Sequence, residues 1–253
     1  MKSLPLAVQL YTLRDQCAQD FEGTLRAVAR MGWRAVELAG FHGMPPRDLR
    51  KLLLELKLQP FAMHAGMDRL RNQLEEVIHE GHLLETLFIV CSALPENCRK
   101  NADGYRQGAR WLDAAGARLL DHQLQLCYHN HAFEFDLFEN QSGLDLLYQE
   151  CESRNVKAEL DVYWVKKGGG DPVQWIEQLG RRCALLHLKD MGADGGFAEV
   201  GAGRLDFTAI LKAAQKAGTH GYIVEQDVCP RPPLESLAIS LENLRRLAPN
   251  LYA

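Results

Sequence analysis

Residues 124–131 are Leu-Gln-Leu-Cys-Tyr-His-Asn-His, a short and mostly apolar run that is followed directly by imidazole and amide side chains. A run of this length with few polar positions is typical of a parallel strand that is buried on both faces. The stretch therefore predicts a buried strand that carries polar, chemically useful groups at its carboxyl end.

Similar apolar runs recur along the chain and alternate with longer segments whose apolar residues have helical spacing. The expected strands are Leu6–Leu10, Ala35–Leu38, Pro60–His64, Thr86–Cys91, Leu124–Tyr128, Val156–Asp161, Ala184–Leu188 and Tyr222–Glu225. The clearest helices are Phe21–Met31, Asp68–Leu84, Asn101–Gln123, Asp206–Ala217 and Pro233–Leu247, and another starts at Asp171-Pro172. Eight strands alternating with about eight helices predict an α/β fold, a single (β/α)₈ TIM barrel over residues 1–253, with a doubly wound open sheet as the alternative.

Composition excludes several classes of protein. The net charge of −4 gives no electrostatic reason to bind nucleic acid, and no run of 18 apolar residues predicts a membrane span. The N-terminus leads into a strand without a signal-peptide pattern. Seven cysteines without a C-x-x-C pair indicate reduced thiols and a cytoplasmic protein. No surface stripe specifies an oligomer, although homo-oligomers are common for this fold.

The last four expected strands end in side chains that can bind a metal ion. These residues are His129, Asp161, His187 and Glu225, and Glu134 lies a few positions after the first of them. A buried charge must be paired or metal-bound, and neighbouring strands are about 4.8 Å apart, so the four ends can converge on one ion. Any one of them alone would more often be an ordinary hydrogen-bonding or ion-paired group. Together they predict one divalent cation, Mn²⁺, Mg²⁺, Co²⁺ or Zn²⁺, because the set mixes nitrogen and oxygen donors.

The same strand ends carry a resemblance to a known family. The stretches that carry it are Val8–Asp15, Val36–Phe41, Tyr128–Phe135, Glu159–Trp164, Leu186–Asp190 and Val224–Asp227. In this order they resemble the xylose isomerase-like sugar phosphate isomerase/epimerase superfamily over nearly the whole chain. The resemblance is specific for the superfamily and poor at naming a substrate.

By resemblance, the metal is held by Glu, Asp, His and Glu on strands five to eight. Asp161, His187 and Glu225 match the last three of these ligands. The first ligand is either Glu134 or His129. We expect Glu134 slightly ahead of His129, because a second carboxylate neutralises the ion better, and Glu134 is alternatively a substrate contact.

The epimerase-like branch of the family implies proton transfer beside a carbonyl, with a metal that polarises the carbonyl. Glu225 is the expected base, and Glu134, His129 or His131 is its partner across the substrate. The predicted function is an isomerase or epimerase of a keto-sugar or cyclic polyol. An inosose-dehydratase-like lyase is the alternative. An abasic-site endonuclease, which would need an extra histidine where Trp164 stands, and a non-catalytic sugar-binding module are less favoured.

Five further residues are candidate substrate contacts, each with a plain structural alternative. They are His64, Glu37, Lys189, Trp164 and Arg204. For His64 the alternative is a strand-end hydrogen bond, for Glu37 an ion pair across the barrel, and for Lys189 a buried pair with Asp161 or Glu225. Trp164 could simply pack in the core, and Arg204 could belong to a loop before a helix. The glycine-rich segment 192–197 is a candidate lid.

Overall fold

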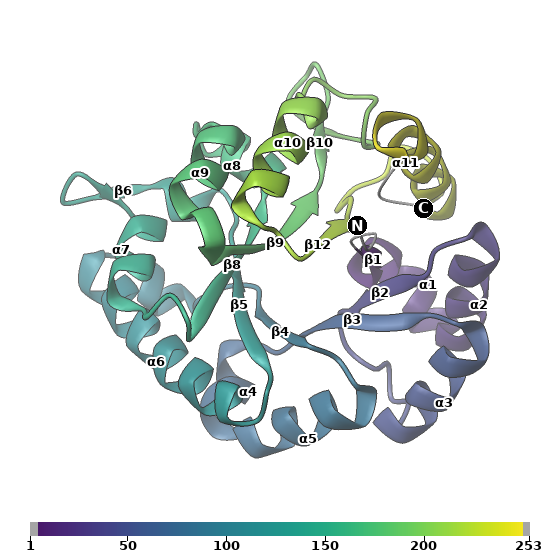
Figure 1. Ribbon diagram of the computed structural model, residues 1–253, viewed down its shortest axis with the longest axis horizontal. Helices are drawn as coiled ribbons and strands as arrows, with labels where there is room; N and C mark the ends of the chain where they lie inside the picture. Colours follow the sequence, from purple (N-terminus) through teal and green to yellow (C-terminus); the bar gives the residue numbers. More distant parts are fainter. Residues whose placement is uncertain (1–4, 250–253) are drawn as a thin grey trace.

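The barrel closes on itself in a computed structural model that describes residues 5–249 (Figure 1). All its strands are parallel, in the order β1-β12-β9-β8-β5-β4-β3-β2. Their bounds are β1 Leu6–Gln9, β2 Ala35–Leu38, β3 Gln59–His64, β4 Phe88–Cys91, β5 Gln125–His129, β8 Val156–Asp161, β9 Cys183–Leu188 and β12 Gly221–Val224. The predicted (β/α)₈ barrel is confirmed, and the open-sheet alternative is wrong.

Helices form an outer ring around this barrel (Figure 1). They are α1 Arg14–Gln19, α2 Phe21–Met31, α3 Pro46–Leu56, α4 Met67–Asn72, α5 Leu74–Leu84, α6 Ala102–Asp121, α7 Gly143–Glu150, α8 Val162–Lys167, α9 Pro172–Leu179, α10 Phe207–Ala217 and α11 Pro233–Leu247. The expected helix Asp68–Leu84 is interrupted at Gln73, whose φ of −137° and ψ of 33° are not helical. Glu75 and Glu76 favour a new start there, because carboxylates are stabilised in the first turn of a helix.

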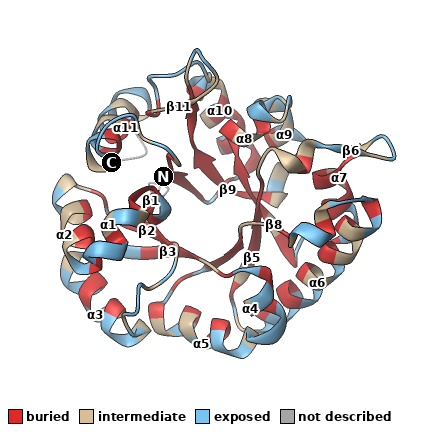
Figure 2. Cartoon of the chain, turned by 180° about the vertical axis from the view of Figure 1, so that it is seen from behind, coloured by how far each residue is buried: buried red, intermediate tan, exposed pale blue. Residues whose placement is uncertain are grey.

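The inside of the barrel changes from apolar to polar along its axis. Figure 2 shows the strands buried along their lengths, while exposed residues lie on the outer helices and loops. Small, aliphatic and aromatic side chains such as Ala7, Ile223 and Phe61 form an apolar cluster of their own. Gly221 is required there, because a Cβ atom would lie 2.3 Å from the Phe61 ring. Charged residues at the carboxyl ends of the strands replace the apolar filling and create the site.

Residues 190–206, which follow β9, are ordered by a single buried carboxylate. Asp190 accepts hydrogen bonds from the main-chain N–H groups of Met191, Gly201, Gly203 and Leu205. Within this loop β10 (Asp190–Met191) pairs with β11 (Phe197–Ala198), and the Tyr163 hydroxyl donates to the Gly195 carbonyl over 3.1 Å. The candidate lid segment is therefore tethered to α8.

Two findings bear on the expectations from composition. All seven cysteines are free thiols, and six of them are buried. In the part of the chain that the structure describes, no helix is both long enough and apolar enough to cross a membrane.

Candidate metal centre and active site

Four side chains from neighbouring strands meet at the carboxyl end of the barrel. His129 and Asp161 are the last residues of β5 and β8, His187 is the last but one of β9, and Glu225 directly follows β12. Each offers a donor atom, and these atoms all lie within 4.8 Å of one another. Asp161 and His187 are direct partners in the strand register, which puts them at the same level of the barrel. We call these four residues the upper group, and all of them are buried.

The spacing of the upper group suits a bound cation. His187 Nδ1 lies 2.9 Å from Glu225 Oε2 and 4.0 Å from Asp161 Oδ2, and His129 Nε2 lies 3.9 Å from Asp161 Oδ2. Ligands about 2.1 Å from one ion are separated by roughly 3 to 4 Å. Asp161 Oδ1 accepts from the Trp164 N–H and caps α8, whereas the buried Oδ2 makes no hydrogen bond. This oxygen faces Lys189 Nζ at 3.0 Å in an ion pair, so a ligand bond to it would form beside that ammonium.

Lys189 provides a positive charge beside the upper group. Its fully buried Nζ lies 3.0 Å from Asp161 Oδ2, 2.8 Å from Glu225 Oε2 and 2.8 Å from Asp227 Oδ2. Burial alone would lower the pKa of this ammonium, but the three carboxylates raise it overall. The buried ion pair that was the structural alternative for Lys189 is present. The pKa of Glu225 is lowered, because Lys189 and His187 outweigh the opposing effect of burial.

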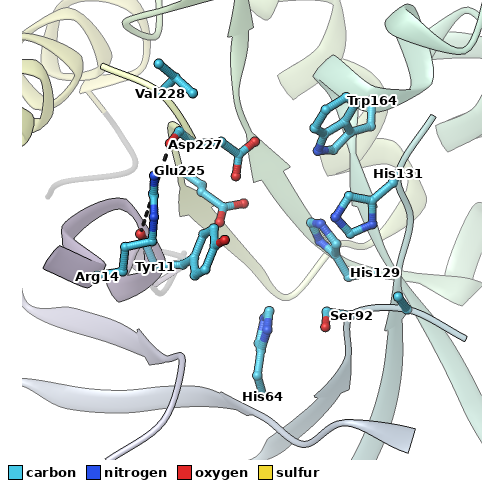
Figure 3. A pocket seen from close by; sticks show the side chains of 11 residues that line it. Tyr11, Arg14, His64, Ser92, His129, His131, Trp164, Glu225, Asp227 and Val228 are labelled. Carbon is cyan, nitrogen blue, oxygen red and sulfur yellow. Dashed lines mark hydrogen bonds between the residues drawn. The ribbon is translucent and has the colours of Figure 1, made fainter. Parts of the chain in front are cut away.

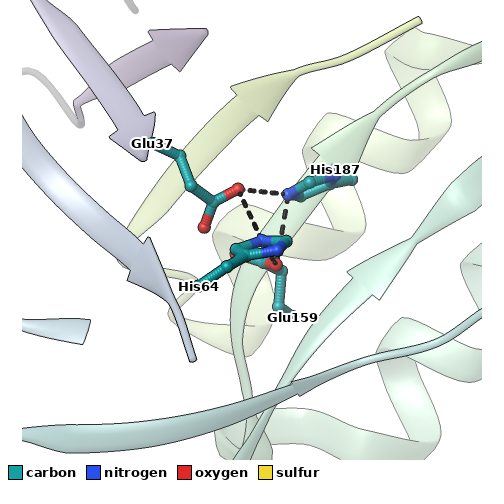
Figure 4. A group of neighbouring side chains, drawn as sticks. All are labelled: Glu37, His64, Glu159 and His187. Carbon is teal, nitrogen blue, oxygen red and sulfur yellow. Dashed lines mark hydrogen bonds and ion pairs between the residues drawn. The ribbon is translucent and has the colours of Figure 1, made fainter. Parts of the chain in front are cut away.

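A second set of charged side chains, the lower group, adjoins the first deeper in the barrel (Figure 4). It consists of Glu37, His64, Glu159 and His187, so His187 belongs to both groups. His187 Nε2 lies 2.7 Å from Glu37 Oε2, which also accepts from Gln9 Nε2 over 2.7 Å. Neither oxygen of the fully buried Glu159 makes a hydrogen bond, and burial raises the pKa of its carboxyl group to about 7.

A cavity of about 530 Å³ opens next to the upper group (Figure 3). Its lining residues are Tyr11, Arg14, His64, Ser92, Ala93, His129, His131, Trp164, Glu225, Asp227 and Val228. Five of these, His64, His129, His131, Trp164 and Glu225, were candidates from the sequence. Tyr11, Arg14 and Asp227 were not among the candidates from the sequence, although each follows a strand end. Asp227 is two residues after Glu225, the spacing that puts side chains on the same face of an extended chain.

Glu134 lies outside both groups and does not line the cavity. It stands in the 3₁₀ turn Phe133–Phe135, which folds its buried carboxylate back onto β5. One oxygen accepts from the Tyr128 hydroxyl over 2.6 Å and the other from the His131 N–H over 2.7 Å. Burial raises the pKa of this carboxyl group to about 7. The structure therefore places His129 in the upper group and Glu134 outside it, whereas the sequence put Glu134 slightly ahead as the strand-five ligand.

The remaining candidates fall in different places. His131 stacks on Phe133 with ring centroids 5.2 Å apart, and burial together with the Lys189 charge lowers its pKa to about 4. Glu37 is fully buried and does not line the cavity, so it makes the cross-barrel contact that was its structural alternative. Arg204 is exposed, lies outside the lining and contacts the Met191 sulfur over 3.0 Å.

The sequence model of the family described as xylose isomerase-like TIM barrel matches residues 25–247. The chain belongs to this family. A sugar phosphate isomerase/epimerase from Parabacteroides distasonis has a similar structure, with a TM-score of 0.87 and 23% identity over 99% of this chain and 96% of that one. None of the curated proteins is similar enough in sequence to match.

Two further solved members of the fold carry more specific descriptions. A D-psicose 3-epimerase studied in the presence of D-fructose has a TM-score of 0.72 and 14% identity, over 96% of this chain and 99% of that one. A probable 3-DHS dehydratase from Bacillus anthracis has a TM-score of 0.76 and 14% identity, over 95% of this chain and 98% of that one. At these identities the likeness establishes the shared fold.

Proposed function

We propose that this xylose isomerase-like barrel is a metal-dependent isomerase or epimerase that moves a proton beside the carbonyl of a keto-sugar or cyclic polyol. The observation that carries the proposal is the upper group: four potential ligands from four neighbouring strands whose donor atoms lie within 4.8 Å of one another. Two of them, His129 and Glu225, also line the 530 Å³ cavity, so a bound ion would face a substrate there.

The donor set fits one divalent cation. His129 Nε2, Asp161 Oδ2, His187 Nδ1 and Glu225 Oε2 would hold it. Asp161 Oδ2 supports this assignment, because it is buried and accepts no hydrogen bond. Two imidazoles with two carboxylates suit Mn²⁺, Co²⁺ or Zn²⁺, and the two carboxylates would also bind Mg²⁺. When bound, such an ion polarises a substrate carbonyl and stabilises negative charge on its oxygen.

Glu225 is the proposed base. It lines the cavity beside the other members of the upper group, so its carboxylate can accept a proton from the carbon beside the carbonyl. His131 faces it from the other side of the cavity and is neutral at pH 7, because its pKa is lowered to about 4 (Figure 3). We assign His131 as the group that relays a proton on the opposite face of the substrate.

Other side chains position the substrate. The Trp164 ring lies 5.5 Å from the His131 ring and forms an apolar part of the cavity wall. His64 stands at the opposite end of the lining and also contacts Glu37 of the lower group over 3.4 Å. A sugar ring against Trp164, with its hydroxyls toward His64, would place a carbonyl near the upper group.

Proton exchange with solvent tests the proposal. The protein, supplied with Mn²⁺ in D₂O, should incorporate deuterium beside the carbonyl of at least one member of a panel of ketohexoses and inososes. Glu225→Gln should slow this exchange by about 10²- to 10⁴-fold, the usual contribution of a general base. Glu199→Gln is the matched control, because Glu199 is a buried carboxylate paired with Ser236 and Arg231 outside the cavity. Absence of exchange across the whole panel would count against the proposal.

A lyase is the second candidate, because loss of water from a polyol ketone begins with the same proton abstraction. The structural likeness to a probable 3-DHS dehydratase supports the lyase as the second candidate function. The same panel separates the two: an isomerase or epimerase gives exchanged or rearranged sugar. A lyase gives an unsaturated ketone with a new ultraviolet absorbance.

A further inference from the structure

The two histidines of the upper group have opposite ring orientations. His187 directs Nδ1 toward Glu225 and Asp161, at 2.9 and 4.0 Å, and directs Nε2 toward Glu37 at 2.7 Å. His129 directs Nε2 toward Asp161 at 3.9 Å and directs Nδ1 toward Glu159 at 3.4 Å. Each imidazole therefore has one nitrogen in the upper group and the other facing its own carboxylate.

A neutral imidazole can bind a metal through one nitrogen only while the other carries the proton. The hydrogen bond to a carboxylate decides which nitrogen that is. On the basis of the proposed metal site, we infer that Glu37 and Glu159 are positioning residues that fix opposite tautomers of the two histidines. His187 would carry its proton on Nε2, and His129 would carry its proton on Nδ1.

The contact of His187 with Glu37 is already formed in the structure. Glu37 Oε2 lies 2.7 Å from His187 Nε2 and is held in place by Gln9 Nε2 over 2.7 Å. All three side chains are fully buried. Glu159 Oε2 is also near this nitrogen, at 3.1 Å, but without hydrogen-bond geometry. Because His187 has only one proton to donate from Nε2, Glu37 takes it and Glu159 remains free for another donor.

His129 and Glu159 lie close together but do not form a hydrogen bond in the structure. His129 Nδ1 makes no hydrogen bond, neither do the two oxygens of Glu159, and both side chains are buried. Unpartnered buried polar groups are costly, and here a donor and an acceptor without partners face each other 3.4 Å apart. A small rotation of the His129 ring, as its Nε2 engages an ion, would bring the pair into hydrogen-bond range. The register pairs His129 with Glu159 on adjacent strands, so this contact is built into the barrel.

The lower group could in principle be a second cation site, because its donor atoms also lie within 4.8 Å of one another. An ion there would take His187 Nε2 as a ligand and would break its hydrogen bond to Glu37. Our inference therefore requires one ion per chain, bound by the upper group, with the lower group left as hydrogen-bonding support.

Nitrogen-15 NMR of histidine-labelled, Zn²⁺-loaded wild-type protein tests the inference directly. It should show Nε2–H with a metal-bound Nδ1 for His187, and Nδ1–H with a metal-bound Nε2 for His129. The same tautomer on both rings, or two Zn²⁺ per chain, would overturn it. This measurement needs no variant and so does not depend on how a substitution affects folding.

Zn²⁺ affinity provides the second test. Glu37→Gln and Glu159→Gln should each weaken Zn²⁺ binding by about 10- to 100-fold, the usual cost of losing a carboxylate behind a ligand histidine. Glu199→Gln should bind as the wild type does, and circular dichroism checks that all variants are folded. If the wild type binds Zn²⁺ and both variants bind it equally well, the inference fails while the metal site stands. If the wild type binds no metal, the proposed function fails as well.

Discussion

The ammonium of Lys189 lies 2.8 Å from the carboxylate of Glu225, which is at once the proposed base and a member of the upper group. Lys189 also contacts Asp161 and Asp227, so one positive charge is shared among three carboxylates. Two negative charges are left over, and a divalent cation would neutralise them. We therefore propose that the lysine and the metal ion neutralise complementary shares of this negative charge.

Replacing Lys189 by methionine should make the stability of the protein strongly dependent on metal. Removing one partner of a buried ion pair costs about 3 to 5 kcal/mol, because the remaining charges are left uncompensated. Urea unfolding should show this loss in metal-free protein, and Mn²⁺ should restore more stability to Lys189→Met than it adds to the wild type. Lys167→Met is the control, because Lys167 is exposed. Equal stabilisation of wild type and variant by Mn²⁺ would contradict the charge balance.

Glu134 should make stability fall as pH rises. Its pKa is about 7 in the folded protein against an ordinary 4.5, so between these values the folded state holds a proton that the unfolded state has lost. The contribution of Glu134 to stability is then greatest below pH 4.5 and declines toward pH 7, by at most roughly 3 kcal/mol. Urea unfolding at several pH values should give a steeper decline for the wild type than for Glu134→Gln. Parallel profiles would show that the Glu134 pKa is not raised.

Truncation of Trp164 should weaken substrate binding more than it slows the chemical step. The ring lines the cavity and carries no proton in the proposed mechanism, so Trp164→Ala removes contact area that ground state and transition state share. A loss of about 1 kcal/mol corresponds to a roughly fivefold higher KM with nearly unchanged kcat. Steady-state kinetics on the substrate found by deuterium exchange measures both. A fall in kcat with constant KM would instead give Trp164 a role in the reaction step.

Substitution of Asp190 by asparagine should loosen the loop after β9. The carboxylate accepts four main-chain N–H groups, and an amide cannot accept all four because one side of it is a donor. Hydrogen exchange should therefore become faster at the amides of Gly201, Gly203 and Leu205. Asp194→Asn is the comparison, because Asp194 is exposed and accepts from the Gly196 N–H at the tip of the loop. Unchanged protection in Asp190→Asn would mean that the loop is held by other contacts.

The strand pattern and the ends of the strands could be predicted from the sequence. Apolar runs alternating with amphipathic helices predict parallel strands in an α/β fold, and parallel strands bring all their carboxyl ends to one edge or rim. His129, Asp161, His187 and Glu225 were therefore expected to meet without knowledge of any contact. The same reasoning predicted that Lys189 lies near this group, since residues two apart on a strand share a face.

Only the tertiary structure showed that His129, and not Glu134, belongs to the upper group, and only it revealed the lower group. Five positions separate His129 from Glu134, and the intervening turn fixes which side chain points inward; its direction depends on the Tyr128 hydroxyl and the His131 N–H. Glu37 and His187 stand 150 residues apart and meet across the closed barrel. Periodicity along one strand fixes the face on which a side chain lies. The distance and angle between side chains from opposite walls arise only when the barrel closes and its interior packs.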